Sequence, residues 1–359
     1  MSIEHKRLEH LLAKFSDVRI AIVGDFFLDR YWQVDPALDE ASIETGLAAW
    51  QVVETRCSPG AAGTVAANLA ALGVGQIEAV GFVGNDGEGF ELQNCFNRLG
   101  ISRKYLQQTP LCVTPCYTKP MRNGVEMNRV DIKNRSATPT TIESRVIDSI
   151  NELTDLSQPH CVDAVIIMDQ VSEENCGVIT ENVRSRLIEL GRERKHQRPL
   201  IYADSRERIG LFREMLIKCN DREALEQFGL YDEHKMAKVP REILQNCGWR
   251  LAQRTGRAVF ITMGPQGQLL FDPEKQGASN TPEQNVRHVP AVSVEGEIDI
   301  CGAGDSTSAA LVASLCAGAT LEEAALIGNL AASVTIRKIG QTGTASPDEI
   351  LAAHKAALS

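Results

Sequence analysis

The chain lacks the sequence marks of several common protein classes. Its 359 residues contain no Gly-Lys dipeptide and hence no Walker A phosphate loop, and Thr307 interrupts a Gly-x-Gly-x-x-Gly motif that would begin at Gly302. Its ten cysteines form no Cys-x-x-Cys pair and match no histidine cluster, which argues against a zinc site. No apolar run is long enough to span a membrane, and residues 1–17 have the pattern of a charged amphipathic helix rather than a signal peptide. We therefore expect a cytoplasmic protein with no membrane partner.

Positive charge is scarce as well. The chain has 37 Lys and Arg residues against 47 Asp and Glu residues, a net charge of -10. Because such a surface repels the phosphates of nucleic acids, we expect no nucleic-acid partner. The hydrophobic share of 43% suffices for a large core at this length, so residues 1–359 are predicted to form a single α/β domain. An anionic substrate would then need a local basic pocket.

Short β-branched runs alternate with helical patterns along the chain. The expected strands are residues 18–24, 77–83, 162–168, 200–203 and 259–263. The expected helices are residues 63–72, 87–99, 140–153, 173–193, 241–255, 305–317 and 321–337. This alternation predicts a doubly wound, mostly parallel sheet flanked by helices, with ligands at the carboxyl ends of its strands. Two segments, at about 31–57 and 112–135, break the alternation and could pair into a small β lid.

The most informative motif is Asp-Ile-Cys-Gly-Ala-Gly-Asp at residues 299–305, which runs into an Ala/Leu-rich helical segment. Gly302 and Gly304 allow a tight turn, so that backbone N–H groups and the positive end of the helix can approach an anion. Asp305 could then take the proton from an attacking hydroxyl. An isolated Asp in a first helical turn would more simply cap the helix, and the neighbouring glycines favour the catalytic role.

The motif Asp-x-x-Gly-Ala-Gly-Asp resembles the C-terminal signature of the ribokinase-like (pfkB) carbohydrate kinases. The resemblance covers residues 18 to about 346 and implies a ribokinase-like fold with a β-sheet lid. It also implies transfer of the γ-phosphoryl group of ATP to a sugar hydroxyl. In that reaction Asp305 would be the base, and the amides of Gly302, Ala303 and Gly304 would hold the transferring group.

A second motif on the nucleotide side follows the same resemblance. Asn220-Asp221-Arg222-Glu223 matches the family's Asn-x-x-Glu element, which organises metal and phosphate. Asn220 and Glu223 offer hard oxygen ligands for a hydrated Mg²⁺ that is shared with the nucleotide. Alone, the same four residues would be a helix start with a capping glutamate. Their position after Asp204-Ser205-Arg206, where the family has an Asp-Pro-x-Lys-like turn, favours the metal role.

Further nucleotide-side residues are implied by the resemblance alone. The nucleotide-binding candidates that match the family's Thr-x-Gly-x-x-Gly and adenine-side segments are Thr262, Gly264, Gly267 and Asn329. Family members often hold a monovalent cation, such as K⁺, below the anion hole. Asp299 is the side chain expected to support it.

The acceptor side has weaker motifs. Asp25 and Asp29 follow the first expected strand and could accept hydrogen bonds from adjacent sugar hydroxyls, or could lie in an ordinary capped loop. The run from Gly24 to Trp32 resembles the start of the heptose 7-phosphate kinase branch of the family. At the next helix start the family usually has a double Gly and an Asn, where this chain has Gly60-Ala61 and Thr64. Tight packing of the helix on the sheet would explain these small residues equally well.

The segment after Asp169, a further candidate for substrate binding, departs from that branch. The heptose kinases usually continue with Tyr, one variable residue, Lys and Gly, whereas this chain continues with Gln-Val-Ser-Glu. A phosphate-binding lysine is therefore missing. The basic lid residues that could replace it, or that could be solvated surface charges, are Arg30, Lys119, Arg122, Arg129 and Lys133. Arg129 is the residue we assign to the substrate.

Several functions remain open at this point. The acceptor could be a sugar or a sugar phosphate, heptose 7-phosphate among them. A nucleoside kinase of the same fold and a non-catalytic member that binds a sugar or nucleotide are the alternatives. A nicotinamide dehydrogenase is disfavoured because the chain lacks its fingerprint. Family members sometimes dimerise through the lid, so a homodimer through the lid is a further expectation.

Overall fold

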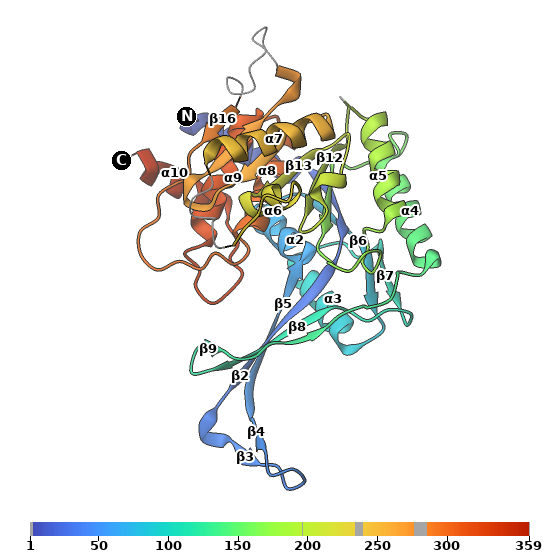
Figure 1. Cartoon of the computed structure of the whole chain (residues 1–359), viewed down its shortest axis with the longest axis vertical. Coiled ribbons are helices and arrows are strands. Elements are labelled where there is room, and N and C mark those ends of the chain that lie inside the picture. Colours follow the sequence, from blue (N-terminus) through green and yellow to red (C-terminus); the bar gives the residue numbers. More distant parts are fainter. Residues whose placement is uncertain (1–2, 196, 234–239, 276–285, 359) are drawn as a thin grey trace.

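The computed structural model describes residues 3–195, 197–233, 240–275 and 286–358. Within these residues the largest sheet has nine strands, in the order β16-β15-β14-β13-β12-β11-β1-β6-β7 (Figure 1). Its strands are β1 (Arg19–Gly24), β6 (Gln76–Gly84), β7 (Leu106–Thr109), β11 (Ala164–Asp169), β12 (Leu200–Ser205), β13 (Leu216–Asn220), β14 (Val259–Thr262), β15 (Gln268–Phe271) and β16 (Val286–Val289). Neighbours are parallel except at β14–β15 and β15–β16. The mostly parallel sheet predicted from the sequence is therefore confirmed.

Helices cover both faces of this sheet. One face carries α1 (His5–Ala13), α2 (Ala62–Ala71), α3 (Gly87–Leu99), α8 (Ala303–Cys316), α9 (Leu321–Thr335) and α10 (Pro347–Leu358). The other face carries α4 (Thr140–Thr154), α5 (Glu181–Glu193), α6 (Asp221–Glu226) and α7 (Arg241–Thr255). Along β1, Ile20 and Ile22 enter the first core and Ala21 and Val23 enter the second, as the two-residue period of a strand requires.

None of the described helices combines the length and the apolar character needed to cross a membrane.

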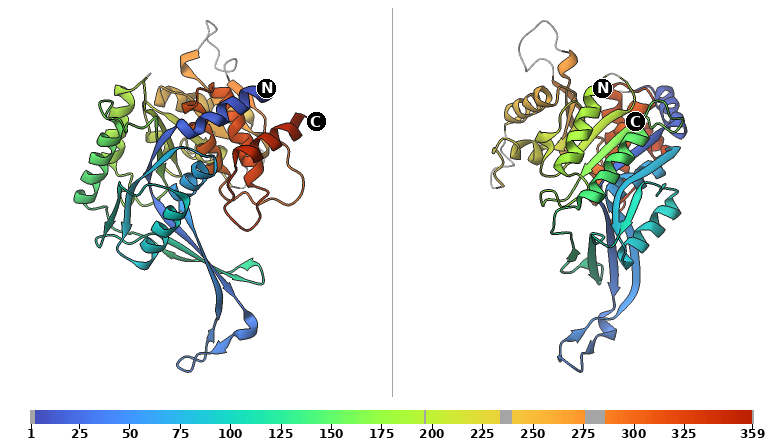
Figure 2. Two further views of the ribbon diagram at one scale, coloured as in Figure 1. Left: turned by 180° about the vertical axis from the view of Figure 1, so that it is seen from behind. Right: turned by 90° about the vertical axis from the view of Figure 1, so that its right-hand side faces the viewer.

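A second sheet, which we call the lid sheet, has the order β10-β8-β2-β5, with β9 paired to β8. Its strands are β2 (Phe26–Val34), β5 (Val52–Ala61), β8 (Cys116–Arg122), β9 (Val125–Glu126) and β10 (Val130–Ile132). The β2/β5 hairpin projects from the body as a long arm, and β3 (Glu40–Ala41) and β4 (Ala48–Ala49) lie near its tip (Figures 1 and 2). The pairing of β2 with β5 begins at Phe26 and Ala61, so the strands extend beyond the expected segment 31–57.

The helices expected at 173–193 and 305–317 begin at other residues than the sequence predicts. The helix expected at 173–193 begins only at Glu181, where the hydroxyl of Thr180 accepts the N–H of Val183 at 3.3 Å. Residues 170–178 form a loop instead. Helix α8 begins two residues earlier than expected because Gly302 takes a left-handed φ of 77° as its N-cap, which places Asp305 in the first turn.

Candidate active site

A cavity of about 830 Å³ lies between the carboxyl ends of the central strands and the lid sheet. The two sets of residues that line it differ in origin. One set, which we call the transfer end, consists of Asp204, Lys218, Asn220, Glu223 and Asp305. The other, which we call the acceptor end, consists of Asp29, Thr64, Lys119 and Arg129. The structure thus brings together the two groups of motifs that are farthest apart in the sequence.

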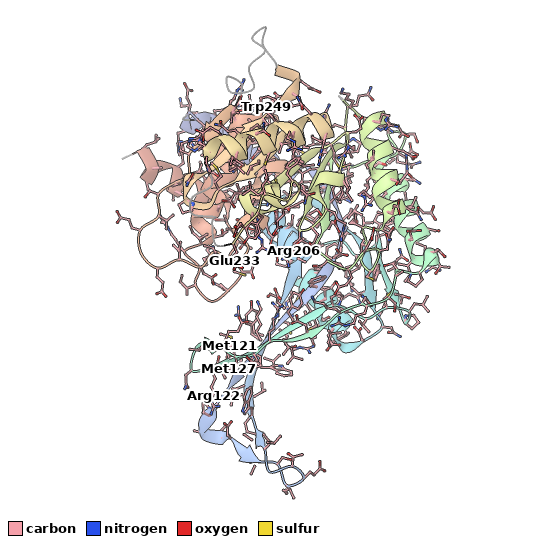
Figure 3. All side chains as sticks on the ribbon, viewed as in Figure 1. Met121, Arg122, Met127, Arg206, Glu233 and Trp249 are labelled. Carbon is pink, nitrogen blue, oxygen red and sulfur yellow. The ribbon has the colours of Figure 1, made fainter. Side chains whose placement is uncertain are left out.

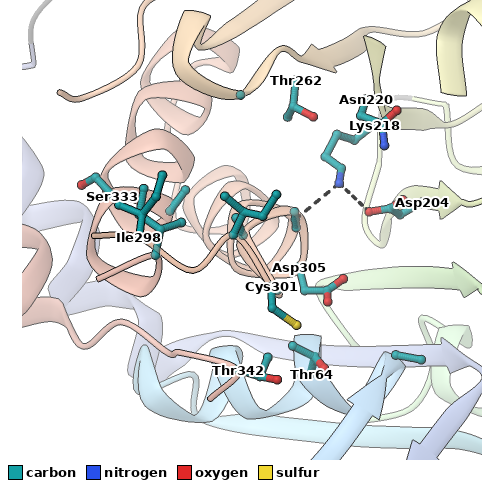
Figure 4. A pocket seen from close by; sticks show the side chains of 18 of the residues that line it. Thr64, Asp204, Lys218, Asn220, Thr262, Ile298, Cys301, Asp305, Ser333 and Thr342 are labelled. Carbon is teal, nitrogen blue, oxygen red and sulfur yellow. Dashed lines mark hydrogen bonds and ion pairs between the residues drawn. The ribbon is translucent and has the colours of Figure 1, made fainter. Parts of the chain in front are cut away.

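The carboxylate of Asp305 points into the cavity from the first turn of α8 (Figure 4). Among the residues that the structure describes, none donates a hydrogen bond to this carboxylate, so it does not serve as a cap. Burial, and then the nearby Asp204 carboxylate, raise the pKa of Asp305 to about 7. A carboxylate with this pKa and a free lone pair is suited to accept a proton near neutral pH.

The backbone at the start of α8 carries part of the predicted anion site. Gly302, Ala303 and Gly304 all line the cavity. The N–H of Ala303, however, donates to the carbonyl of Ile300 at 3.2 Å, so this amide is already used inside the turn. At Gly302 a Cβ would lie 2.6 Å from Cγ2 of Thr342, so both the left-handed φ and the space require glycine.

A buried ion pair stands beside Asp305. The Nζ atom of Lys218 lies 2.7 Å from Oδ2 of Asp204 and donates to the carbonyl of Gly304 at 3.3 Å (Figure 4). Burial lowers the pKa of Lys218, but the charges of Asp204 and its other neighbours outweigh burial and raise it, so the side chain is a cation. Since Lys218 contacts both an acid and the backbone at the start of α8, it links β13 to the predicted phosphate site.

Asn220 and Glu223 form the start of a helix and also line the cavity. Asn220 caps α6 by accepting the N–H of Glu223 at 2.7 Å, and Oε2 of Glu223 accepts the N–H of Asn220 at 2.8 Å. Both residues also line the cavity. Burial, and then Asp204, raise the pKa of Glu223 to about 7. The second carboxylate oxygen of Glu223 has no hydrogen-bond partner in the described part of the chain.

The nucleotide-side candidates divide into two groups. Thr262, Gly264 and Asn329 line the cavity, whereas Gly267 does not. The side-chain amide of Asn329 is held by Gln268 at 2.7 Å and by the carbonyl of Pro290 at 2.9 Å, so it fixes the 289–290 backbone. A Cβ at Gly267 would lie 2.2 Å from the carbonyl oxygen of Val289, so Gly267 permits the same close approach of two backbone segments.

Asp299 also lies outside the cavity lining. Its two carboxylate oxygens accept the N–H of Cys301 at 3.0 Å and the N–H of Gly340 at 3.1 Å. The side chain therefore ties the turn before α8 to the turn after α9. In the described residues, no group of three or more His, Cys, Asp and Glu side chains is arranged to hold a metal ion.

At the acceptor end, three of the six predicted substrate residues line the cavity. These are Asp29, Thr64 and Arg129. Burial raises the pKa of Asp29, and the charges of Lys119 and Arg129 oppose this shift. Gly60 lies beneath Asp29 across the β2–β5 pair, because a Cβ there would be 2.8 Å from Oδ2 of Asp29. Gly60 therefore makes room for Asp29 instead of lining the cavity.

Asp25 and Asp169 do not line the cavity, contrary to their predicted contact with the sugar. Asp25 stands between β1 and β2 with 4% of its surface exposed, and its carboxylate accepts backbone N–H groups from the loop after β11. Asp169 at the end of β11 is 2% exposed and is paired with Arg208 at 2.7 Å. Both carboxylates therefore face protein groups, Asp25 where the chain passes from β1 into β2 and Asp169 where β11 ends.

The basic residues of the lid also form two groups, those that line a cavity and those that pair with acidic side chains. Lys119 and Arg129 line the cavity, and Lys133 lines a smaller recess beside it. Arg30 instead pairs with Glu88 at 3.0 Å, and Arg122 pairs with Asp39 at 2.9 Å. In Figure 3, Arg122 lies on the lid sheet and away from Arg206, which belongs to the body.

Two basic residues of the cavity, Lys218 and Arg206, were assigned no role from the sequence. Lys218 is the single charge in the apolar run 215–219, and a lone lysine near the end of a buried strand is a usable signal for a buried ion pair. Arg206 follows β12 and lines both the cavity and the recess. Its guanidinium has no ion pair or hydrogen bond with any residue that the structure describes. Its charge helps to lower the pKa values of Asp305 and Glu223.

The fold is the ribokinase-like α/β fold. The structure superposes on the ribokinase of Thermotoga maritima with a TM-score of 0.64 at 18% identity, covering 94% of this chain and 99% of that one. It superposes on phosphofructokinase-2 of Escherichia coli, solved in complex with potassium, with a TM-score of 0.69 at 16% identity, covering 95% of this chain and 99% of that one. At these identities the likeness establishes the fold.

The sequence comparisons establish the family. Residues 33–349 match the model of the pfkB family carbohydrate kinases. The bifunctional protein HldE of Geobacter metallireducens is 26% identical over 353 residues, which cover 97% of this chain and 65% of that protein. HldE of Nitrobacter winogradskyi is 30% identical over 313 residues, which cover 85% of this chain and 57% of that protein. The aligned part thus spans about two thirds of these relatives or less.

This chain belongs to the pfkB family of carbohydrate kinases. Members of the family are phosphotransferases with an alcohol group as acceptor, so the dehydrogenase alternative is wrong.

Proposed function

We propose that this chain is an ATP-dependent kinase that phosphorylates a hydroxyl group of a sugar phosphate. The observation that carries the proposal is the carboxylate of Asp305, which faces the cavity without a hydrogen-bond partner among the described residues and has a pKa of about 7. The acceptor hydroxyl gives its proton to Asp305 while its oxygen forms a bond to the γ-phosphorus. The bond between that phosphorus and the β,γ-bridging oxygen breaks, and ADP leaves.

The transfer end would neutralise the charge that develops in this step. We assign the contact with the transferring group to Lys218, Arg206 and the amides of Gly302 and Gly304. The amide of Ala303 is assigned to the turn, because its hydrogen bond to Ile300 already occupies it.

Asn220 and Glu223 fit a hydrated Mg²⁺. Both carry hard oxygens on the cavity wall, and one oxygen of Glu223 is unpartnered among the described residues. A bound Mg²⁺ would supply charge neutralisation for the nucleotide phosphates. For a monovalent cation such as K⁺ we infer an indirect role of Asp299, because both of its carboxylate oxygens already accept N–H groups.

The acceptor end favours an anionic substrate. Lys119 and Arg129 line this end of the cavity, in an otherwise acidic protein. Asp29 lies among them and would accept hydrogen bonds from sugar hydroxyls. We therefore propose a sugar phosphate, heptose 7-phosphate among the candidates, with the phosphate near the basic residues.

The test is a coupled ADP-release assay with ATP and Mg²⁺ across free sugars, sugar phosphates and nucleosides, with Asp305→Asn as the matched blank. We expect turnover with at least one sugar phosphate and a far weaker signal from the blank. Preferred turnover of a nucleoside would favour the nucleoside-kinase alternative. Binding of ATP without turnover of any acceptor would favour the non-catalytic alternative.

We also infer that the arm associates with a second copy of this chain. Strand β5 is an edge strand of the lid sheet, and the arm exposes Ile43, Leu47, Trp50 and Val53, of which Ile43 is fully exposed. E. coli phosphofructokinase-2 has been solved in a tetrameric form. Sedimentation velocity should show a dimer that Leu47→Glu/Val53→Glu converts to a monomer, whereas a monomeric wild type would reject the inference.

A further inference from the structure

The loop that joins β11 to α5, residues 170–178, forms one wall of the acceptor end. Gln170 lines both the cavity and the adjoining recess, and Val171, Ser172 and Glu173 line the recess. The loop has no regular secondary structure to fix its position. Its backbone N–H and C=O groups must therefore form hydrogen bonds with other parts of the protein, and these bonds determine the position of the wall.

Three N–H groups of the loop are held by one buried carboxylate. Oδ2 of Asp25 accepts the N–H of Gln170 at 2.9 Å and the N–H of Val171 at 3.2 Å, and Oδ1 accepts the N–H of Val178 at 2.7 Å. Asp25 thus joins the beginning and the end of the loop. Because Asp25 is the residue between β1 and β2, it also connects the loop to the junction of the main sheet and the lid sheet.

Two carbonyl groups near the beginning of the loop are held by one guanidinium, whereas Thr138 donates to the carbonyls of Asn175 and Gly177 near its end. Arg208 donates to the carbonyl of Ser172 at 2.9 Å and to the carbonyl of Val171. The same guanidinium pairs with Asp169 at 2.7 Å and 3.2 Å, and the hydroxyl of Ser205 donates to Asp169 at 2.6 Å. The contacts with Asp169 therefore fix the Arg208 guanidinium independently of the loop.

The loop supplies the hydrogen bonds that Asp25 receives in this cluster. Two carboxylates, Asp25 and Asp169, are buried here, and the one ion pair with Arg208 is formed by Asp169. Burial, and then Asp169, raise the pKa of Asp25 to about 6, while the three N–H donors of the loop lower it. The loop therefore stabilises the ionised Asp25, and the ionised Asp25 holds the loop.

We infer that Asp25 and Arg208 are positioning residues that hold loop 170–178 as a wall of the acceptor end, an inference that rests on the proposed kinase function. Asp25 acts through the backbone of the loop and does not touch the sugar. The position of Gln170 follows from this pair, and with it the shape that the acceptor must fit.

Asp25→Asn tests the inference. Asparagine offers one oxygen and one NH₂ group where three N–H donors converge, so in either orientation its NH₂ faces at least one donor. We expect faster hydrogen–deuterium exchange in peptides covering residues 168–180 and a rise of about tenfold in the KM for the acceptor, the cost of about one lost interaction. The KM for ATP should stay unchanged. Asp29→Asn is the matched control, because it should raise the acceptor KM without altering exchange in the loop.

Gly177→Ala provides a second variant if Asp25→Asn does not fold. A Cβ at residue 177 would lie 2.5 Å from Oδ1 of Asp25 and 3.0 Å from Cβ of Val171, so it pushes the loop away from an intact carboxylate. The same faster exchange and the same rise in acceptor KM are expected.

A raised acceptor KM in Asp25→Asn with normal exchange would overturn the inference in favour of a direct sugar contact. Faster exchange with a normal acceptor KM would show that the loop does not shape the site. Normal exchange in both variants would show that Asp25 does not hold the loop. This outcome would overturn the inference even if no acceptor were ever found.

Discussion

The two ends of the cavity are built in different ways. At the transfer end, Lys218 and Asp204 project from neighbouring strands of the main sheet, and their side chains are 6% and 7% exposed. At the acceptor end, Arg129 lies just before β10 of the lid sheet, its side chain is 42% exposed, and its guanidinium pairs with Asp131 at 2.7 Å. The first set is fixed by the core, whereas the second depends on where the lid lies.

This difference suits the two ends of the cavity to two functions, phosphoryl transfer and acceptor selection. Groups that stabilise the transferring phosphoryl group must not move during the reaction, and the buried strand ends provide that rigidity. Groups that select the acceptor can sit on a more exposed sheet that varies independently of the core. Changes at the transfer end should therefore lower kcat, and changes at the acceptor end should raise the acceptor KM.

Asp305→Asn should have the largest effect on turnover. We expect kcat to fall by ~10²- to 10⁴-fold because the base is lost, with little change in ATP affinity. Since the folded state raises the pKa of Asp305, its ionised form costs stability above pH 7, so the variant should unfold at the same or a higher temperature. Steady-state kinetics and thermal unfolding at pH 8 check both expectations. Near-normal turnover would refute the base.

Lys218→Met should have the largest effect on stability. It leaves the buried Asp204 carboxylate without its cation, which typically costs ~3–5 kcal/mol in the free energy of unfolding. Urea denaturation measures the loss. The double variant Lys218→Met/Asp204→Asn is the control and should recover most of it. An equal loss in both would show that the ion pair is not the cause.

The pH dependence of the rate should follow the ionisation of the transfer end. Asp305 must be ionised to accept a proton and Glu223 to attract a metal, and both have a pKa of about 7. Below that value, kcat/KM should fall by about tenfold or more per pH unit, and above it kcat/KM should level off. Rates between pH 5.5 and 9 test this expectation. A flat profile over that range would exclude both groups.

At the acceptor end, Arg129→Ala should raise the KM for a sugar phosphate by about tenfold, the size of one charge-assisted hydrogen bond. The kcat value should stay nearly constant, because Arg129 lies just before β10 of the lid sheet and not beside Asp305. Comparison with the unphosphorylated sugar separates the loss of a phosphate contact from a general disturbance. An equal rise for both acceptors would place the phosphate elsewhere.

The smallest expected effect is that of Arg122→Ala. Arg122 belongs to the same sheet as Lys119 but pairs with Asp39 and does not line the cavity. Its loss should leave acceptor KM and kcat unchanged and alter stability by less than about 1 kcal/mol. A clear rise in acceptor KM would mean that the lid moves further during the reaction than this structure indicates.

The sequence alone predicts the transfer end better than the acceptor end. Gly302 to Asp305 and Asn220 to Glu223 are contiguous motifs at helix starts, so local geometry suffices to place them. The partners of Asp29 depend on the register between β2 and β8, which no short motif contains. Asp25 and Asp29 both closely follow β1 in the sequence, yet the Asp25 carboxylate binds backbone groups of the protein and Asp29 lines the cavity. They differ because Asp25 lies where the chain passes from β1 into β2, whereas Asp29 lies within β2.

Initial-rate kinetics of Asp305→Asn, Arg129→Ala and the double variant on the best sugar phosphate test whether transfer and selection are separate. We expect the first variant to lower kcat, the second to raise the acceptor KM, and the two losses to multiply in kcat/KM, as expected for independent sites. If Asp305→Asn changed only the acceptor KM, or if the double variant were no worse than either single one, the separation of transfer and selection would be contradicted.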